Sequence, residues 1–184
     1  MRKVVLSSLL SLDGIAEEPG DWVFDPDDRL VEHLGQVIAS QDAVLLGRGT
    51  FDYWVDYWPS SNFEPFASFI NTTPKYVFTS TTPSATWASS TFVNAPAVAY
   101  VAELKRGEGG HIGIHGSIAL AQSLLRAEAV DELRLVIAPT LAGRGRRLFD
   151  GDESPPLQRF ELTDLERTST GLVLARYTKR AEPV

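Results

Sequence analysis

The chain has 184 residues, 43% of them hydrophobic, which suits one compact domain spanning residues 1–184. The net charge of −7 argues against a nucleic-acid or anionic-membrane surface, because phosphate binding needs clustered lysine and arginine. With no cysteine, the chain cannot use disulfides, thiolate catalysis or cysteine metal sites. No signal peptide or membrane span is recognisable, so we expect a cytoplasmic protein that binds a small molecule.

Hydrophobic periodicity predicts alternating strands and helices over the first two-thirds of the chain. Strands are expected at 3–10, 43–47, 76–78, 91–93, 111–115 and 130–138, and helices at 30–38, 50–58, 63–70, 97–105 and 118–125. A long loop is expected at 11–27, and a glycine- and arginine-rich loop at 139–150. The last two strands, 157–167 and 172–178, are joined by a turn at 168–171. This order predicts an α/β fold with a mainly parallel mixed sheet and a C-terminal antiparallel hairpin.

The first candidate site follows the strand at 43–47. There Gly47-Arg48-Gly49 leads into a helix, with Thr50 as the expected N-cap. Backbone N–H groups and the helix dipole at such a junction favour an anion, and a guanidinium can clamp it. The alternative is a tight strand-to-helix turn that carries a surface arginine.

A second junction of the same kind lies at Gly116-Ser117, before a helix that opens with Ile118. A third strand ends in four hydroxyl residues, 79–82, which can donate to a phosphate or simply form a turn. The carboxyl ends of parallel strands share the binding edge of an open α/β sheet. Three anion-friendly strand ends on one edge predict a dinucleotide better than a single phosphate.

Several other chemistries lack their motifs. The chain has no Gly-x-Ser-x-Gly nucleophile elbow, no Walker lysine and no spaced-glycine fingerprint after a strand. His111 and His115 would lie roughly 13 Å apart along one strand, too far to share a zinc ion. A metal site is therefore not expected.

Six short segments form a pattern, and their order and spacing along the chain are more specific than any single segment. They are 11–16 (Ser-Leu-Asp-Gly-Ile-Ala), 46–51 (Leu-Gly-Arg-Gly-Thr-Phe), 77–80, 116–117, 130–133 and 139–145. Together they resemble the dihydrofolate reductase superfamily over nearly the whole chain. The resemblance is closest to the bacterial branch that contains the reductase domain of riboflavin biosynthesis. It implies the three-layer fold of that superfamily.

The resemblance also implies NADPH as the hydride donor, with Arg48 and Ser80 near its adenosine 2′-phosphate. The residues implied along the pyrophosphate and nicotinamide half are Gly47, Thr50, Gly116, Ser117 and Ile118. Ser117 replaces the second glycine of the family's pair, so its side chain can crowd the pyrophosphate or donate to it. An arginine on the 2′-phosphate predicts that NADPH is preferred over NADH by about ten- to a hundredfold.

The substrate side of the resemblance is less complete. Trp22 would correspond to the family's loop tryptophan, but the family's helical carboxylate falls at Val31, so we do not expect folate reduction. Glu32 is the neighbouring candidate, with a solvated helical acid as the alternative. Asp13 either forms a turn or binds substrate near the nicotinamide. No catalytic residue is identified.

These observations favour an NADPH-dependent reductase of a small planar heterocycle or related carbonyl or imine. The alternatives are a non-catalytic dinucleotide-binding or regulatory module and a flavin- or deazaflavin-binding protein. Tyr53, Trp54 and Trp58 either wall a planar pocket or belong to the core. The resemblance further implies a homodimer through the C-terminal strands.

Overall fold

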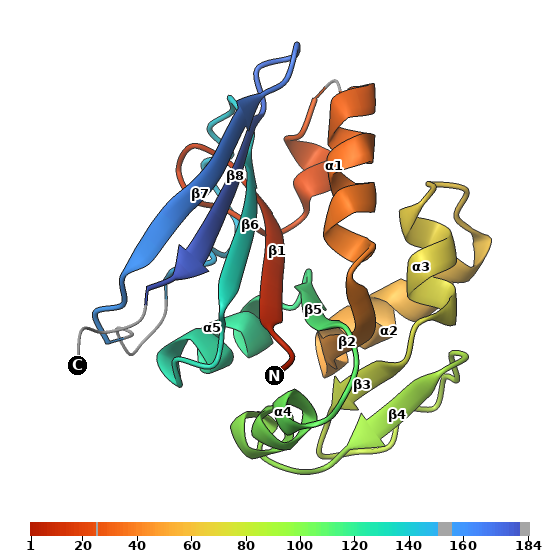
Figure 1. The fold of residues 1–184 in the computed structure, drawn as a ribbon. Coiled ribbons are helices and arrows are strands. Elements are labelled where there is room, and N and C mark those ends of the chain that lie inside the picture. Colours follow the sequence, from red (N-terminus) through yellow and green to blue (C-terminus); the bar gives the residue numbers. More distant parts are fainter. Residues whose placement is uncertain (25, 151–155, 181–184) are drawn as a thin grey trace.

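The computed structural model describes residues 1–24, 26–150 and 156–180. Within these residues one sheet has eight strands, in the order β4-β3-β2-β5-β1-β6-β8-β7 (Figure 1). The strands are β1 (Val4–Leu10), β2 (Gln41–Gly47), β3 (Lys75–Phe78), β4 (Ser90–Val93), β5 (His111–His115), β6 (Glu132–Ile137), β7 (Phe160–Arg167) and β8 (Val173–Lys179). The helices are α1 (Asp28–Ile38), α2 (Arg48–Tyr57), α3 (Phe66–Thr72), α4 (Ala97–Arg106) and α5 (Ile118–Arg126).

The sheet is mainly parallel. Strands β1 to β6 pair in parallel, whereas β8 runs antiparallel to both β6 and β7. This confirms the predicted mixed sheet and the C-terminal hairpin. The central strand β1 lies between β5 and β6, two strands that come more than a hundred residues later in the chain.

Helices cover both faces of the sheet, which gives the three layers that the resemblance implied (Figure 1). Successive side chains of a strand point to opposite faces of the sheet, so the apolar side chains of β2 contribute to the core on both faces. Leu45 packs with Val101 of α4 and Leu124 of α5, whereas Val44 and Leu46 pack with the residues of α1 and α3. All three β2 side chains are fully buried.

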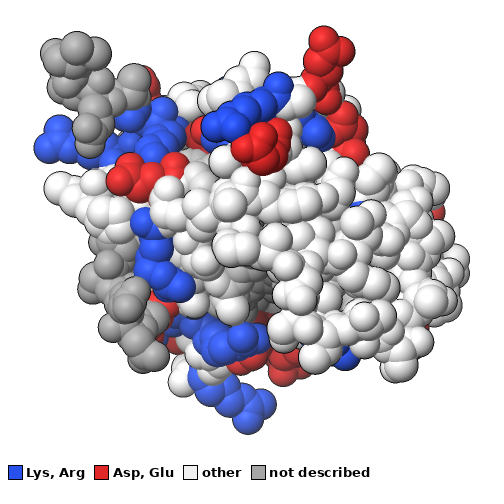
Figure 2. All heavy atoms as spheres, turned by 90° about the horizontal axis from the view of Figure 1, so that it is seen from below, with Lys and Arg blue, Asp and Glu red and all other residues white. Residues whose placement is uncertain are grey.

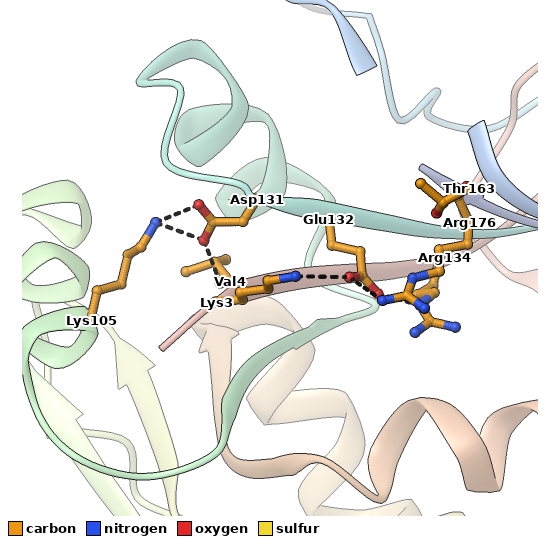
Figure 3. Close-up of polar contacts among 8 residues, drawn as sticks. All are labelled: Lys3, Val4, Lys105, Asp131, Glu132, Arg134, Thr163 and Arg176. Atoms are coloured by element: carbon orange, nitrogen blue, oxygen red, sulfur yellow. Dashed lines mark hydrogen bonds and ion pairs between the residues drawn. The ribbon is translucent and has the colours of Figure 1, made fainter. Parts of the chain in front are cut away.

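The start of β6 is held by two acidic side chains (Figure 3). Asp131 accepts a hydrogen bond from the Val4 backbone N–H at 2.7 Å and forms an ion pair with Lys105 at 2.6 Å. The next carboxylate, that of Glu132, is buried and its partners are all basic: Lys3, Arg134 and Arg176. The 130–133 motif therefore carries a structural role, because it ties β6 to β1, α4 and β8.

Figure 2 shows the charged side chains on one face of the molecule. On the face seen in Figure 2, basic side chains lie beside acidic ones, and a broad area carries no charge. Among the described residues, no helix combines the length and apolar character needed to cross a membrane. Nor do these residues bring together three or more histidine, aspartate or glutamate side chains in a group able to hold a metal ion.

Candidate dinucleotide-binding site

Helix α2 begins at Arg48, two residues before the start at residue 50 that the sequence predicted. Gly47, in an extended conformation, is the N-cap, so the prediction of Thr50 as the cap is wrong. Thr50 lies in the first turn, and its hydroxyl faces the Gly116 carbonyl at 3.5 Å. No side chain of the described residues caps α2, and the first N–H groups of a helix have no partner within it. These donors remain available to an anion.

Ser117 immediately precedes α5, as predicted, but its hydroxyl does not cap that helix. Instead the buried Ser117 Oγ accepts a hydrogen bond from the Gly47 backbone N–H at 3.0 Å. The N-termini of α2 and α5 therefore meet. The two junctions found in the sequence are therefore in contact, and each carries the partial positive charge of a helix N-terminus.

Gly116 lies between these helices and has no room for a side chain. Its φ of +70° is rarely adopted by other residues, and a Cβ there would stand 2.8 Å from the Trp54 ring. Trp54 is half-buried and packs edge-on against Trp58 and Phe66. The backbone at Gly116 is thus held bare beside an aromatic wall, which supports both of the alternatives that the sequence left open for Trp54.

Arg48 connects the start of α2 with the hydroxyl run after β3. Its Nη1 donates to the Thr81 hydroxyl at 2.9 Å and the Thr81 carbonyl at 3.2 Å, and it lies 3.5 Å from the Thr79 hydroxyl. Its Nε donates to both carboxylate oxygens of Asp52 at 2.7 Å. Ser80 is exposed between the two threonines. Arg48 therefore contacts the residues on either side of Ser80.

Asp13 is occupied by the protein itself. Its carboxylate accepts hydrogen bonds from the Ser11 hydroxyl at 2.6 Å and from the backbone N–H groups of Ala142 at 3.0 Å and Gly143 at 2.9 Å. These bonds, that of Ser11 first, lower the pKa of Asp13 to about 2. This geometry agrees with the turn interpretation and ties the loop after β1 to the loop after β6.

The other two substrate candidates differ in their exposure. Trp22 is only 4% exposed, donates to the Glu17 carbonyl at 2.9 Å and packs with Leu30 in the core. The Glu32 side chain is 62% exposed and pairs with Arg29 at 2.6 Å. Trp22 thus belongs to the core, and Glu32 is a solvated helical acid, which was the alternative that the sequence left open for it.

Two residues near the site were not predicted from the sequence to be part of it. The His115 ring precedes Gly116, is fully enclosed and shares a hydrogen bond of 2.8 Å with the Gln41 side chain. Burial lowers the pKa of His115 to about 4, so its ring is neutral at pH 7. Asp52 follows Arg48 by four residues, and this i, i+4 spacing of opposite charges on a helix was the signal that could have predicted the ion pair.

The donor set fits an anionic dinucleotide. Two uncapped helix N-termini and one guanidinium face the same region, and a bare glycine backbone lies between them. Hydroxyls at the end of β3 add further donors beside Arg48. Such groups are the ones that recognise a pyrophosphate and a second phosphate.

Comparisons with known proteins identify the family and the fold of this chain. A family model described as RibD C-terminal domain matches residues 2–174. The uncharacterized protein YyaP of Bacillus subtilis (strain 168) is 32% identical over 157 residues, which cover 80% of each chain. A putative riboflavin biosynthesis protein from Shewanella sp. PV-4 has the same fold, with a TM-score of 0.78 at 20% identity, covering 97% of this chain and 99% of that one.

Two enzymes of known name share the fold at lower similarity. The Thermotoga maritima diaminohydroxyphosphoribosylaminopyrimidine deaminase/5-amino-6-(5-phosphoribosylamino)uracil reductase gives a TM-score of 0.68 at 16% identity, covering 97% of this chain and 57% of that one. Dihydrofolate reductase from Enterococcus faecalis, solved with NADP(H), gives 0.65 at 13% identity, covering 97% of each chain. With its matched family model, its relatives and its sheet order, this chain belongs to the RibD C-terminal domain family.

Proposed function

We propose that this protein is an NADPH-dependent reductase of a small planar heterocycle or a related carbonyl or imine. The observation that carries the proposal is the hydrogen bond between Ser117 Oγ and the Gly47 N–H, which joins two uncapped helix N-termini beside Arg48. Membership of the RibD C-terminal domain family supports a reductase, as do the names of the T. maritima and E. faecalis enzymes.

Each group in the site has a role in this proposal. The N–H groups at the starts of α2 and α5 bind the pyrophosphate, and the bare backbone at Gly116 lets the dinucleotide approach closely. Arg48 and the neighbouring hydroxyls bind the adenosine 2′-phosphate. The bound cofactor supplies the hydride, while the protein supplies orientation and electrostatics.

The proton for the reduced substrate comes from water or from the substrate itself in this proposal. Asp13, with its pKa near 2, is ionised at neutral pH and has no proton to donate. Glu32 is solvent-exposed and paired with Arg29. A Trp54 ring beside Gly116 offers a planar apolar surface that suits a flat heterocycle.

The test is a titration of the purified protein with NADPH, NADH, FMN and a deazaflavin, followed by a screen for oxidation of bound NADPH with carbonyl and imine acceptors. We expect saturable NADPH binding and turnover with a small acceptor. Preferential flavin or deazaflavin binding would overturn the proposal. Tight NADPH binding without turnover on any acceptor would favour a dinucleotide-binding or regulatory module, an alternative supported by the poor availability of Asp13 and Glu32 as acids.

A further inference from the structure

Arg48, the one residue proposed to recognise the 2′-phosphate by charge, already has a counter-ion. Both oxygens of the Asp52 carboxylate accept from Arg48 Nε, while Arg48 Nη1 is turned toward Thr81. The guanidinium is therefore held between an acid on its own helix and the loop after β3. Any phosphate that binds Arg48 must share it with Asp52.

The ion pair is accessible to a ligand. The side chains of Arg48 and Asp52 are 36% and 48% exposed. A pair in this setting is partly screened by water, so it weakens the attraction of Arg48 for a second anion without blocking it. A 2′-phosphate close to Arg48 would also experience repulsion from the nearby carboxylate.

The Asp52 carboxylate can also favour the binding of NADH. A ribose 2′-hydroxyl is a hydrogen-bond donor, and acidic side chains recognise it in NAD-binding sites. Asp52 is thus placed to disfavour a 2′-phosphate and to accept from a 2′-hydroxyl. Arg48 acts in the opposite direction at the same place, so the two residues divide the recognition of the adenosine ribose between them.

We propose that Asp52 is a specificity-determining residue that reduces the discrimination between NADPH and NADH. The proposal rests on the proposed function, since it assumes that a nicotinamide dinucleotide binds beside Arg48. An unpaired arginine would give a preference for NADPH of about ten- to a hundredfold. With Asp52 beside Arg48, we expect the dissociation constant of NADH to exceed that of NADPH by less than about tenfold in the natural protein.

The test compares four proteins: the natural chain, Asp52→Asn, Arg48→Ala/Asp52→Asn and the control Asp56→Asn. Asp56 is also exposed on α2, one turn further on, and makes no ion pair with Arg48. Dissociation constants for NADPH, NADH, NADP⁺ and NAD⁺ are measured by calorimetry, which does not depend on turnover. Because Asp52 is exposed, its replacement is not expected to unfold the protein, and a melting curve checks this.

We expect Asp52→Asn to raise the preference for the 2′-phosphorylated cofactors by about five- to tenfold. The rise should be larger at low salt, absent from Asp56→Asn and lost again in the double variant. A change of less than about twofold in Asp52→Asn, in a protein that binds both dinucleotides, would overturn the role of Asp52 and leave the proposed function standing. If neither the natural protein nor Asp52→Asn binds any of the four dinucleotides, the proposed function and this assignment both fall.

Discussion

The Ser117 hydroxyl accepts the Gly47 backbone N–H at 3.0 Å, and through this bond the last residue of β2 is fastened to the N-terminus of α5. A glycine at position 117, as in the family pair that the sequence resembles, has no side chain for this contact. Ser117 is 4% exposed, so its hydroxyl is directed into the protein. The Ser117 side chain therefore stabilises the start of α2 from the interior of the protein.

Replacing Ser117 with alanine should lower the free energy of unfolding by about 1–3 kcal/mol, because the Gly47 N–H loses its acceptor. Cofactor affinity should fall with it, since Gly47 positions the start of α2. Chemical denaturation and NADPH titration measure the two effects. Ser123→Ala, in the same helix, is the control. A Ser117→Ala protein as stable as the natural one would contradict this role.

Neither Asp13→Asn nor Glu32→Gln should lower kcat by more than about a hundredfold once a substrate is found. A positioned general acid typically contributes about 10²–10⁴-fold, and Asp13 is ionised while Glu32 is solvated. Steady-state kinetics at pH 7, with NADPH affinity measured alongside, is the check. A loss near 10⁴-fold in either variant, with cofactor binding retained, would identify that carboxylate as the missing acid.

Stability should depend on pH through His115. Its pKa is about 4 in the folded protein and about 6.5 when unfolded, so the unfolded chain binds the extra proton between these values. The free energy of unfolding should therefore rise from pH 4 to pH 6.5, by up to about 3 kcal/mol, and remain at its full value above that range. His115→Gln should flatten this part of the profile, as measured by denaturation at each pH.

A second variant, His33→Gln, should remove a further part of this rise, because burial also lowers the pKa of His33 and acts in the same direction. The lowered pKa values of Asp13 and Asp27 act only at more acidic pH, where their stabilisation is lost. A profile that is flat between pH 4 and 6.5 in the natural protein would show that His115 protonates without cost.

The homodimer implied by the family resemblance has a candidate surface on β7. A bulge between Leu162 and Asp164 shifts the register, so Leu162 and Leu165 face the same side of the sheet, with side chains in a half-exposed apolar row. We predict that Leu162→Lys/Leu165→Lys converts a dimer to a monomer in light scattering, whereas Val98→Lys on α4 leaves it intact. A natural protein that is monomeric at tens of micromolar would exclude this surface.

The sequence predicted the sheet well because its signals are local and strong. Apolar runs without charge marked the buried strands, and Gly171, at φ +90°, closes the hairpin turn that the polar stretch 168–171 indicated. The prediction of Thr50 as the N-cap of α2 was wrong because it depended on residue type alone. Gly47 holds that position without a capping side chain, and its own N–H is bound by Ser117, a residue 70 positions away.

Contacts between distant segments account for the features that the sequence did not predict. Nothing near Asp13 in the chain indicates that Ala142 and Gly143 will supply its hydrogen bonds. Trp22 was placed by analogy with a loop tryptophan, yet the apolar residues around it come from β6 and β8 as well as α1. Patterns within a short window could predict elements and strand ends, but the partners of a loop side chain are set by the tertiary structure.

The contacts of Asp13 also have a consequence for biosynthesis. The first loop of the chain closes on residues 142 and 143, and β1 must wait for β5 and β6 before either of its edges is paired. On the ribosome, β1 is thus made before β5 and β6 but gains both neighbours only after they have been made. Nascent chains arrested before β6 emerges should remain sensitive to protease at their N-termini, and protection should begin only when the loop after β6 has left the exit tunnel.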